Sequence, residues 1–307
     1  MTPALETYRE RPHWSFSAIN QLLNICSLQY HFERETEAEP AFRSVALAFG
    51  SAFHRAMEHV GRYRMEHGDP PQLAEVQDLF ADAWDRQNQH DVRYGEKHSY
   101  ESCQREGINL VSCALEHLDL DEEVLAVNEA FCVPLYRQDG TALDDPLVGE
   151  IDQVVRVGER IVLTDWKTAS RRWSKNQAQN SLQATAYLSA YRTLYPGLEF
   201  EASGMDFRFD VVVKNKTPVF ESHLTTRIDE DFTRLTAIVA QAEALRDSRI
   251  RFPADGSFYC PGCAFKRQCR TWTGSKPVNE TEDHAAIPAS SAETAPAVPA
   301  LAAALAA

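Results

Sequence analysis

The spacing of apolar residues predicts helices in several parts of the chain. In "SFSAINQLLNICSLQYHFERE", residues 15–35, apolar side chains recur at intervals of three and four, and Ser15 or Ser17 can cap the helix. Further helical patterns occupy residues 44–66, parts of 72–127, and 181–195, where Pro196 and Gly197 end the pattern. Residues 229–248, "DEDFTRLTAIVAQAEALRDS", predict one more amphipathic helix.

Between these helical patterns lie runs rich in β-branched and aromatic residues, which favour strands. They occupy residues 126–137, 147–157 and 160–168, and residues 204–214 with 217–226 predict a further hairpin. Helices and strands mixed in this way predict an α/β fold with a mixed central sheet flanked by helices. The helical patterns between His54 and Glu129, about residues 55–127, predict a helical insertion in that fold.

The hairpin of residues 147–168 carries two acidic residues whose positions are coupled by its turn. Gly158 and Glu159 predict a two-residue turn with a positive φ at the glycine. Counting back from this turn places Asp152 directly opposite Asp165, with Lys167 on the same face. Like charges directly opposite destabilise a sheet, and a divalent cation held by their oxygens would remove this penalty. The alternative is an ordinary solvated hairpin that carries these charges.

Composition and charge narrow the classes of protein. The chain has 307 residues and a net charge of −14, which argues against non-specific coating of nucleic acid but allows a local basic groove. The apolar runs are too short to span a bilayer, and the N-terminus lacks a signal-peptide layout, so we expect a cytoplasmic protein without a membrane partner. Residues 1–13 predict a loose leader, residues 14–274 one domain, and residues 275–307 a disordered Ala/Pro-rich tail.

Three of the seven cysteines lie close together in "CPGCAFKRQC", which spans Cys260, Cys263 and Cys269. In a reducing compartment the cysteines indicate free thiols or metal ligation rather than disulfides, and the close spacing of these three favours ligation. A tetrahedral site needs a fourth ligand, and Cys26 is the candidate. The spacing of the cysteines alone does not distinguish Zn²⁺ from an iron–sulfur cluster, because four thiolates can hold either. The other cysteines have apolar neighbours and are expected to be buried: Cys103, Cys113 and Cys132.

The order of several short motifs resembles the PD-(D/E)XK nuclease superfamily, most closely its RecB-like branch. The chain contains Gly-x-Ile-Asp ending at Asp152, Asp-Trp-Lys ending at Lys167, and Gln183-x-x-x-Tyr187. Upstream, Gly50-x-x-x-His54 matches another motif of the branch, and a Ser-rich helix precedes Cys26. Each motif alone is weak, whereas their order and spacing are specific. The resemblance implies a restriction-endonuclease-like fold.

The resemblance also implies roles for individual residues. Asp152, Asp165 and Lys167 would be catalytic, and His54, Asp152, Asp165 and the Trp166 carbonyl would bind Mg²⁺ or Mn²⁺. The cation would lower the pKa of a bound water, and Lys167 would orient that water or stabilise the charge of the transition state. For His54 the alternative is a satisfied core residue. Family members often have a Glu on the preceding strand, which Glu129 would match, although an ordinary strand residue is as good an interpretation.

DNA contacts are implied for a second group of residues. Gln183 and Tyr187 share one helical face and would border the site, although a solvated Gln and a packed Tyr are alternatives. Three cations follow the strand that carries Asp165 and surround Trp173: Arg171, Arg172 and Lys175. Such a mixture of cations and an aromatic ring suits a DNA backbone and a stacked base. Further cations are equally well ordinary surface charges: Lys214, Lys216, Lys266, Arg267 and Arg270.

The cysteines extend the resemblance to a RecB-like subset that includes AddB-type nucleases and CRISPR-associated adaptation nucleases. It implies a [4Fe–4S] cluster held by four thiolates, with Zn²⁺ as the alternative: Cys26, Cys260, Cys263 and Cys269. Such a cluster would tie the N-terminal helix to the end of the domain at residues 260–269.

Together these features predict a metal-dependent DNA nuclease that hydrolyses phosphodiester bonds, an exonuclease or a DNA-end-processing enzyme preferring single-stranded or frayed ends. The chain has no Walker-type phosphate loop, so a helicase or an integration or recombination partner would be a separate protein. The alternatives are a non-catalytic DNA-binding or adaptor protein that keeps the fold, and a zinc-stapled structural component. Polarity, strand preference, oligomeric state and pathway (repair, CRISPR adaptation or phage DNA metabolism) are not specified by these motifs.

Overall fold

The computed structural model describes residues 2–197 and 205–274. The Ala/Pro-rich tail predicted for residues 275–307 lies outside the described residues. None of the described helices is both long and apolar enough to cross a bilayer.

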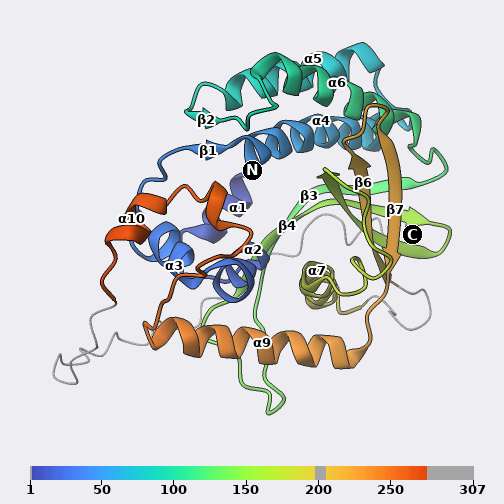
Figure 1. Ribbon diagram of the computed structural model, residues 1–307. Coiled ribbons are helices and arrows are strands. Elements are labelled where there is room, and N and C mark those ends of the chain that lie inside the picture. The colour runs from blue at the N-terminus through green and yellow to red at the C-terminus, as the bar shows by residue number, and fades with distance from the viewer. Residues whose placement is uncertain (1, 198–204, 275–307) are drawn as a thin grey trace.

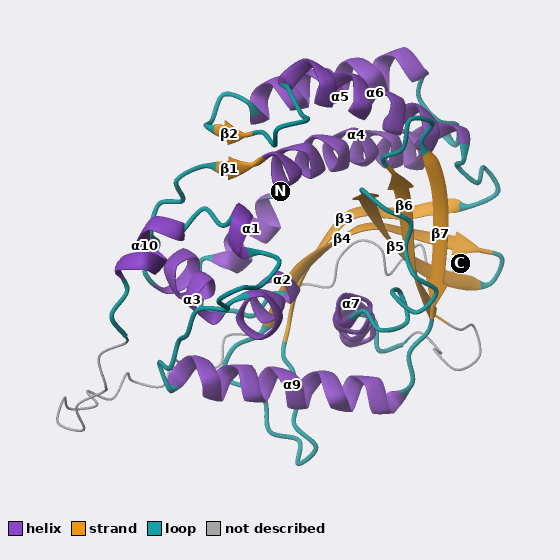
Figure 2. Ribbon diagram, in the orientation of Figure 1, coloured by secondary structure: helices purple, strands orange, loops and turns teal. Residues whose placement is uncertain are grey.

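A mixed five-stranded sheet in the order β3-β4-β5-β6-β7 forms the centre of the molecule (Figure 2). Neighbouring strands are antiparallel except β5 and β6, which are parallel. Parallel neighbours need a crossover, and helix α7 lies in that connection. The predicted α/β fold, a mixed sheet flanked by helices, is therefore confirmed. The strands are β3 (Glu123–Val133), β4 (Leu147–Val157), β5 (Arg160–Ala169), β6 (Met205–Val213) and β7 (Val219–Thr225).

Helices cover both faces of this sheet (Figure 1). On one face lie α4 (Val45–His67), α5 (Leu73–Gln87) and α6 (Tyr100–Glu116), whose apolar residues pack with Trp166 and Val212 of the sheet. On the other lie α7 (Leu182–Leu194) and α9 (Asp229–Asp247), which enclose the larger core. The helical insertion was expected to extend to residue 127, but its last helix ends at Glu116. Residues 123–127 instead pair with β4 because this stretch is mostly β-branched and aliphatic.

The N-terminal segment differs from prediction in two places. Residues expected to form a loose leader contain helix α1 (Pro3–Arg9), which is capped by Thr2 and buries Leu5. The single helix expected over residues 15–35 begins as predicted, with the Ser15 hydroxyl accepting from the Ala18 N–H at 3.2 Å. It is then broken at Cys26, whose φ of −170° is extended. The segment becomes α2 (Phe16–Asn20), a π-helical turn (Gln21–Ile25), α3 (Ser27–Tyr30) and a second π-helical turn (His31–Glu35).

Shorter elements complete the described chain. Strands β1 (Arg43–Ser44) and β2 (Val92–Arg93) pair in parallel beside α4. A 3₁₀ turn (Cys260–Gly262) and helix α10 (Lys266–Thr271) follow α9. Near α10 the side chain of Phe265 packs against Leu28 and Phe32 of the N-terminal segment, so two ends of the sequence meet in one small apolar cluster (Figure 1).

Candidate active site

The hairpin of β4 and β5 has the register that its turn predicts. Val157 pairs with Arg160, and the pairing continues to Gln153 opposite Thr164. Gly158 has a φ of 60°, the positive value that a side chain would disfavour. Asp152 and Asp165 are the next residues on the two strands, just beyond the last backbone pair. The predicted register is confirmed as far as Gln153, and it places the two acidic residues on neighbouring positions of two strands.

Asp152 is held from two directions. Its Oδ2 accepts a hydrogen bond from the backbone N–H of Trp166 at 2.9 Å and lies 3.1 Å from Nδ1 of His54. Trp166 is the residue after Asp165, so this bond fixes one acidic residue to the backbone next to the other. His54 comes from α4, which crosses above the strands. The structure therefore brings His54, Asp152 and the Trp166 backbone together.

Asp165 is 3% exposed and has two side-chain neighbours. Nε2 of Gln183, on α7, donates to Oδ1 at 2.5 Å, and Nζ of Lys167 lies 2.5 Å from Oδ2. Gln183 is itself only 7% exposed, which excludes the alternative of a solvated glutamine. Lys167 shares a face with Asp165, as alternation along the strand predicts.

The charges of the group control one another. Burial alone would lower the pKa of His54, but the charge and hydrogen bond of Asp152 outweigh burial and raise it. Burial opposes ionisation of Asp152, yet His54, Lys167 and the Trp166 N–H hold its pKa below the ordinary value. Burial raises the pKa of Asp165, Lys167 counteracts this, and the Asp152 charge adds to the rise. Pairs of carboxyl groups whose pKa values move apart are typical of functional sites.

Tyr187 lies one turn after Gln183 and is packed by two aromatic rings. Phe131 and Phe207 meet it edge to face, with ring centroids 5.3 Å and 6.0 Å away. Burial raises the pKa of Tyr187, and the charges of Asp165 and Asp152 raise it further. The side chain therefore stays neutral and lies within the electrostatic influence of both acids.

Glu129 does not join this group. Its Oε1 accepts from the hydroxyl of Tyr195 at 2.9 Å, and burial raises its pKa. Glu129 pairs across the sheet with Ile151, one residue away from Asp152, so strand alternation separates the two acids. The sequence did not reveal this displacement.

The predicted DNA-binding cations lie in the exposed loop after β5. Arg171, Arg172 and Lys175 are exposed, and Arg172 pairs with Glu221 of β7 at 3.2 Å. Trp173, between them, lies over Phe209 with centroids 4.9 Å apart and stacks on His223 at 5.5 Å. Lys167 is 6.0 Å from the centre of the same Phe209 ring, so an aromatic contact links this loop to the acidic pair.

A cleft of about 780 Å³ opens on the His54 side of the acids. It lies between α4, the C-terminal end of α5 and strands β3 and β4, and its lining includes His54, Asp152 and Glu150. Oε2 of Glu150 accepts from the N–H and hydroxyl of Thr2, at 3.2 Å and 2.7 Å, so the start of α1 is attached beside the cleft. Asn128, Arg86 and Gln87 also line it, and no sequence motif indicated them.

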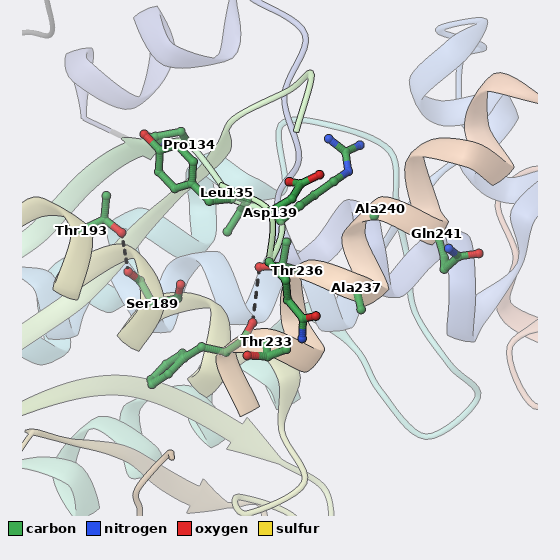
Figure 3. A pocket seen from close by; sticks show the side chains of 14 residues that line it. Pro134, Leu135, Asp139, Ser189, Thr193, Thr233, Thr236, Ala237, Ala240 and Gln241 are labelled. Atoms are coloured by element: carbon green, nitrogen blue, oxygen red, sulfur yellow. Dashed lines mark hydrogen bonds between the residues drawn. The ribbon is translucent and has the colours of Figure 1, made fainter. Parts of the chain in front are cut away.

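A second concavity of about 730 Å³ lies between α7, α9 and the loop after β3 (Figure 3). Its hydroxyl groups are partly used within their own helices, because Thr193 donates to the carbonyl of Ser189 and Thr236 to that of Phe232. None of the predicted site residues lines it.

The four cysteines of the predicted cluster line one cavity of about 150 Å³, although they come from opposite ends of the chain: Cys26, Cys260, Cys263 and Cys269. Burial raises the pKa of the Cys263 and Cys269 thiols, and the neighbouring thiols contribute to the rise. Cys103 and Cys113 are buried in the apolar core, as expected, while Cys132 is half-buried.

The metal sites implied by the resemblance are not preassembled. Among the residues that the structure describes, no three or more His, Cys, Asp or Glu side chains are grouped so that they could hold a metal ion. At the acidic pair His54 and Lys167 contact the carboxylates. The donors still suit a hard cation, because they are carboxylate oxygens and the buried Oδ2 of Asp165 is matched by the Lys167 ammonium alone among the described residues.

The family is shown by comparison with known proteins. A model of the PD-(D/E)XK nuclease superfamily matches residues 13–270, and the chain belongs to that superfamily. The matched range contains all the acidic, basic and cysteine residues described above. A nuclease function in general follows from this membership.

Two solved structures resemble the chain at low identity. One, described as "Putative exonuclease" from Eubacterium rectale, has a TM-score of 0.49 at 11% identity, over 90% of this chain and 94% of that one. Another, SSO0001, has a TM-score of 0.34 at 12% identity, over 79% of this chain and 93% of that one. No curated protein sequence matches significantly. The assignment rests on the family match alone.

Proposed function

We propose that the protein is a divalent-metal-dependent deoxyribonuclease that hydrolyses phosphodiester bonds at DNA ends, preferring single-stranded or frayed ends. The observation that carries the proposal is one compact charged group, His54–Asp152 and Lys167–Asp165, in a chain of a nuclease superfamily. Buried acids paired with a lysine and a histidine are costly for stability alone. Their position beside a large cleft supports a catalytic role.

Asp152, Asp165, His54 and the Trp166 carbonyl are the proposed ligands of Mg²⁺ or Mn²⁺, which nucleases of this superfamily typically use. When bound, the cation neutralises phosphate oxygens and lowers the pKa of a bound water. The Trp166 N–H and the Gln183 amide hold the carboxylates of Asp152 and Asp165 in place, and a bound cation would displace the contacts that His54 and Lys167 make with them.

Lys167 has a separate role in the proposed reaction. Its ammonium lies beside Asp165 at the end of β5 and can hold the attacking water or stabilise the negative charge that grows on the phosphate. Gln183 positions Asp165 through the 2.5 Å hydrogen bond, and Tyr187 lies next to it on the same helical face. Arg171, Arg172 and Lys175 are exposed cations suited to the DNA backbone.

We also infer that the four cysteines hold a [4Fe–4S] cluster, as in the RecB-like subset. The support is that all four cysteines line one cavity, although Cys26 is far from the other three in sequence. Zn²⁺, which four thiolates also hold, is the alternative occupant. A cluster of four irons and four sulfides occupies a volume of its own, with a thiolate at each iron.

Digestion of end-labelled linear and circular DNA, single- and double-stranded, with Mg²⁺ or Mn²⁺, tests the proposed function. We expect cleavage of linear single strands by the native protein, and loss of cleavage with retained DNA affinity in Lys167→Ala. A non-catalytic DNA-binding protein would leave all substrates whole and would bind DNA equally well with lysine or alanine at position 167. Absence of cleavage by pure native protein with manganese present would refute the nuclease proposal.

A further inference from the structure

The cleft on the His54 side contains polar groups to which neither the acidic pair nor the predicted DNA-binding loop assigns a role. Its volume of about 780 Å³ is within the range of ligand sites in general. One wall is α4, with Gly50, Ser51 and His54, and the facing wall is the last turn of α5. None of Arg171, Arg172 and Lys175 lines it, so the cleft is a separate region next to Asp152.

Asn128 lines this cleft and has an unusual backbone conformation. It has a φ of 53° in the middle of β3, a left-handed value that Asn tolerates better than most other residues but that is foreign to an extended strand. The pairs Val127–Gln153 and Glu129–Ile151 on either side place Asn128 opposite Asp152. Its carboxamide makes no hydrogen bond with the residues that the structure describes, so it is available to a ligand in the cleft. Strain of this kind concentrates at functional sites.

The wall formed by α5 carries a cation. Arg86 is exposed and lies in no ion pair or side-chain hydrogen bond with the described part of the chain. Beside it, Oε1 of Gln87 is buried and has no hydrogen-bond partner in that same part of the chain. A basic residue in the last turn of a helix is favourable in itself because of the helix dipole. This effect explains neither the position of Arg86 in the cleft nor the unpaired amide oxygen of Gln87.

We propose that this cleft holds the nucleic-acid strand on the His54 side of the acids, with Arg86 binding a backbone phosphate and the Asn128 carboxamide contacting the nucleotide next to Asp152. The proposal rests on the proposed nuclease function and deepens it. The carboxylates that line the cleft each have a partner: Asp152 contacts His54, Glu150 accepts from Thr2, and Glu58 pairs with Arg55 and Arg62. The guanidinium of Arg86 and the amides of Gln87 and Asn128 are the groups left for a polyanionic strand. The helical insertion thereby supplies part of the substrate site through α5.

Binding of a fluorescein-labelled single-stranded DNA to Lys167→Ala protein tests the role of Arg86, because that background does not consume the probe. Adding Arg86→Gln should weaken binding roughly fivefold. It should also reduce the slope of log affinity against log salt by about 0.7, the value for one lost phosphate contact. The matched control is Arg234→Gln, which removes an exposed arginine of α9 on the opposite face of the sheet. Equal effects of the two substitutions would overturn the role of Arg86.

Asn128→Gly tests the second contact without introducing strain, because glycine adopts a positive φ freely. We expect it to unfold at or above the temperature of the parent protein and still to bind the DNA probe several-fold more weakly. Asn128→Ala should weaken binding equally and also lower the unfolding temperature. A purely structural role predicts that Asn128→Gly binds as tightly as the parent, and that result would remove Asn128 from the site.

The outcomes separate the two proposals. Suppose that the native protein cleaves DNA and the Lys167→Ala protein binds it. If Arg86→Gln then has the same DNA affinity as Arg234→Gln, and Asn128→Gly the same affinity as its parent, the cleft subsite is wrong and the nuclease proposal stands. If the native protein neither cleaves nor binds DNA, both proposals fail together.

Discussion

Nδ1 of His54 lies 3.1 Å from Oδ2 of Asp152, which joins helix α4 to strand β4 at the wall of the cleft. The contact gives the His54 ring a partner in the acidic pair and places it at the cleft. The burial of its neighbours Phe53 and Met57 shows that the adjacent positions of α4 supply the core packing.

Replacement of His54 should therefore impair catalysis more than folding. We expect His54→Ala to lower the cleavage rate roughly 10- to 100-fold, with a higher requirement for Mn²⁺, because one proposed ligand and one partner of Asp152 are lost. His59→Ala is the matched control, since His59 lies on the same helix but pairs with Glu75 at 2.7 Å. Cleavage rates over a Mn²⁺ series give the answer, and equal behaviour of both variants would exclude His54 from the site.

Gln183 is expected to position Asp165, and two substitutions separate packing from charge. Gln183→Ala leaves Oδ1 of Asp165 without its donor and should lower the free energy of unfolding by about 1–3 kcal/mol. Gln183→Glu keeps the size but places a second carboxyl group against Asp165, so its loss of stability should be greater at neutral pH than at acid pH. Urea unfolding at both pH values measures this difference, while Gln179→Ala, at an exposed position, should change little.

Gly149 precedes the first acidic residue in its motif, and packing explains why glycine is needed. A Cβ atom there would lie 2.4 Å from Cζ of Phe131. Gly149→Ala should cost about 1–3 kcal/mol of stability, and adding Phe131→Leu should restore part of it. Gly50→Ala is the contrast, because its Cβ would meet nothing within 4 Å and helix propensity predicts stabilisation by up to about 1 kcal/mol. Denaturant unfolding of the variants measures both effects, and an unchanged Gly149→Ala protein would contradict the packing argument.

Asp210 on β6 predicts a pH dependence of stability. Burial raises its pKa from 3.8 to about 6, against the opposing effects of Arg208 and Ser222. Between these two values the native state binds more protons than the unfolded state, so stability falls as the pH rises through this window.

The Asp210→Asn variant lacks this dependence. As the pH rises from below 3.8 to above 6, the native protein should lose up to about 3 kcal/mol of its free energy of unfolding relative to Asp210→Asn. Exposed Asp78→Asn serves as the control for removal of a negative charge. A constant difference between the native protein and Asp210→Asn across the window would show that Asp210 titrates normally.

The cysteine cavity predicts a metal content that depends on both ends of the chain. Freshly purified protein handled without oxygen should contain iron and acid-labile sulfide, and Cys26→Ser should lose both, as Cys263→Ser should. Cys132→Ser, outside this cavity, should keep them. Zinc without sulfide would identify the alternative metal, and absence of any bound metal would refute a metal role.

Local chemistry was sufficient to predict much of the candidate site. Gly158 set the turn, the turn set the register of β4 and β5, and alternation placed Lys167 on the face of Asp165. These relationships involve residues close in sequence, and hydrogen-bond pairing and side-chain periodicity determine them. The helices α7 and α9 were likewise predicted from apolar spacing.

Contacts between distant segments were beyond such reasoning. The break at Cys26, the attachment of Thr2 to Glu150, and the withdrawal of Glu129 toward Tyr195 each depend on a neighbour far along the chain. The left-handed backbone of Asn128 belongs to the same class, because the local sequence of β3 has ordinary strand character.

The sequence by itself determined the superfamily motifs, the hairpin register and the set of candidate acidic, basic and cysteine residues, because these follow from short-range geometry and residue chemistry. Only the tertiary structure decided which of them meet. Packing of α4 over the sheet brings His54 to Asp152, packing of α7 beneath it brings Gln183 to Asp165, and the end of α5 places Arg86 at the cleft. Non-local packing fixes these contacts, since the free energy of burying helix faces against the sheet sets the positions of the helices.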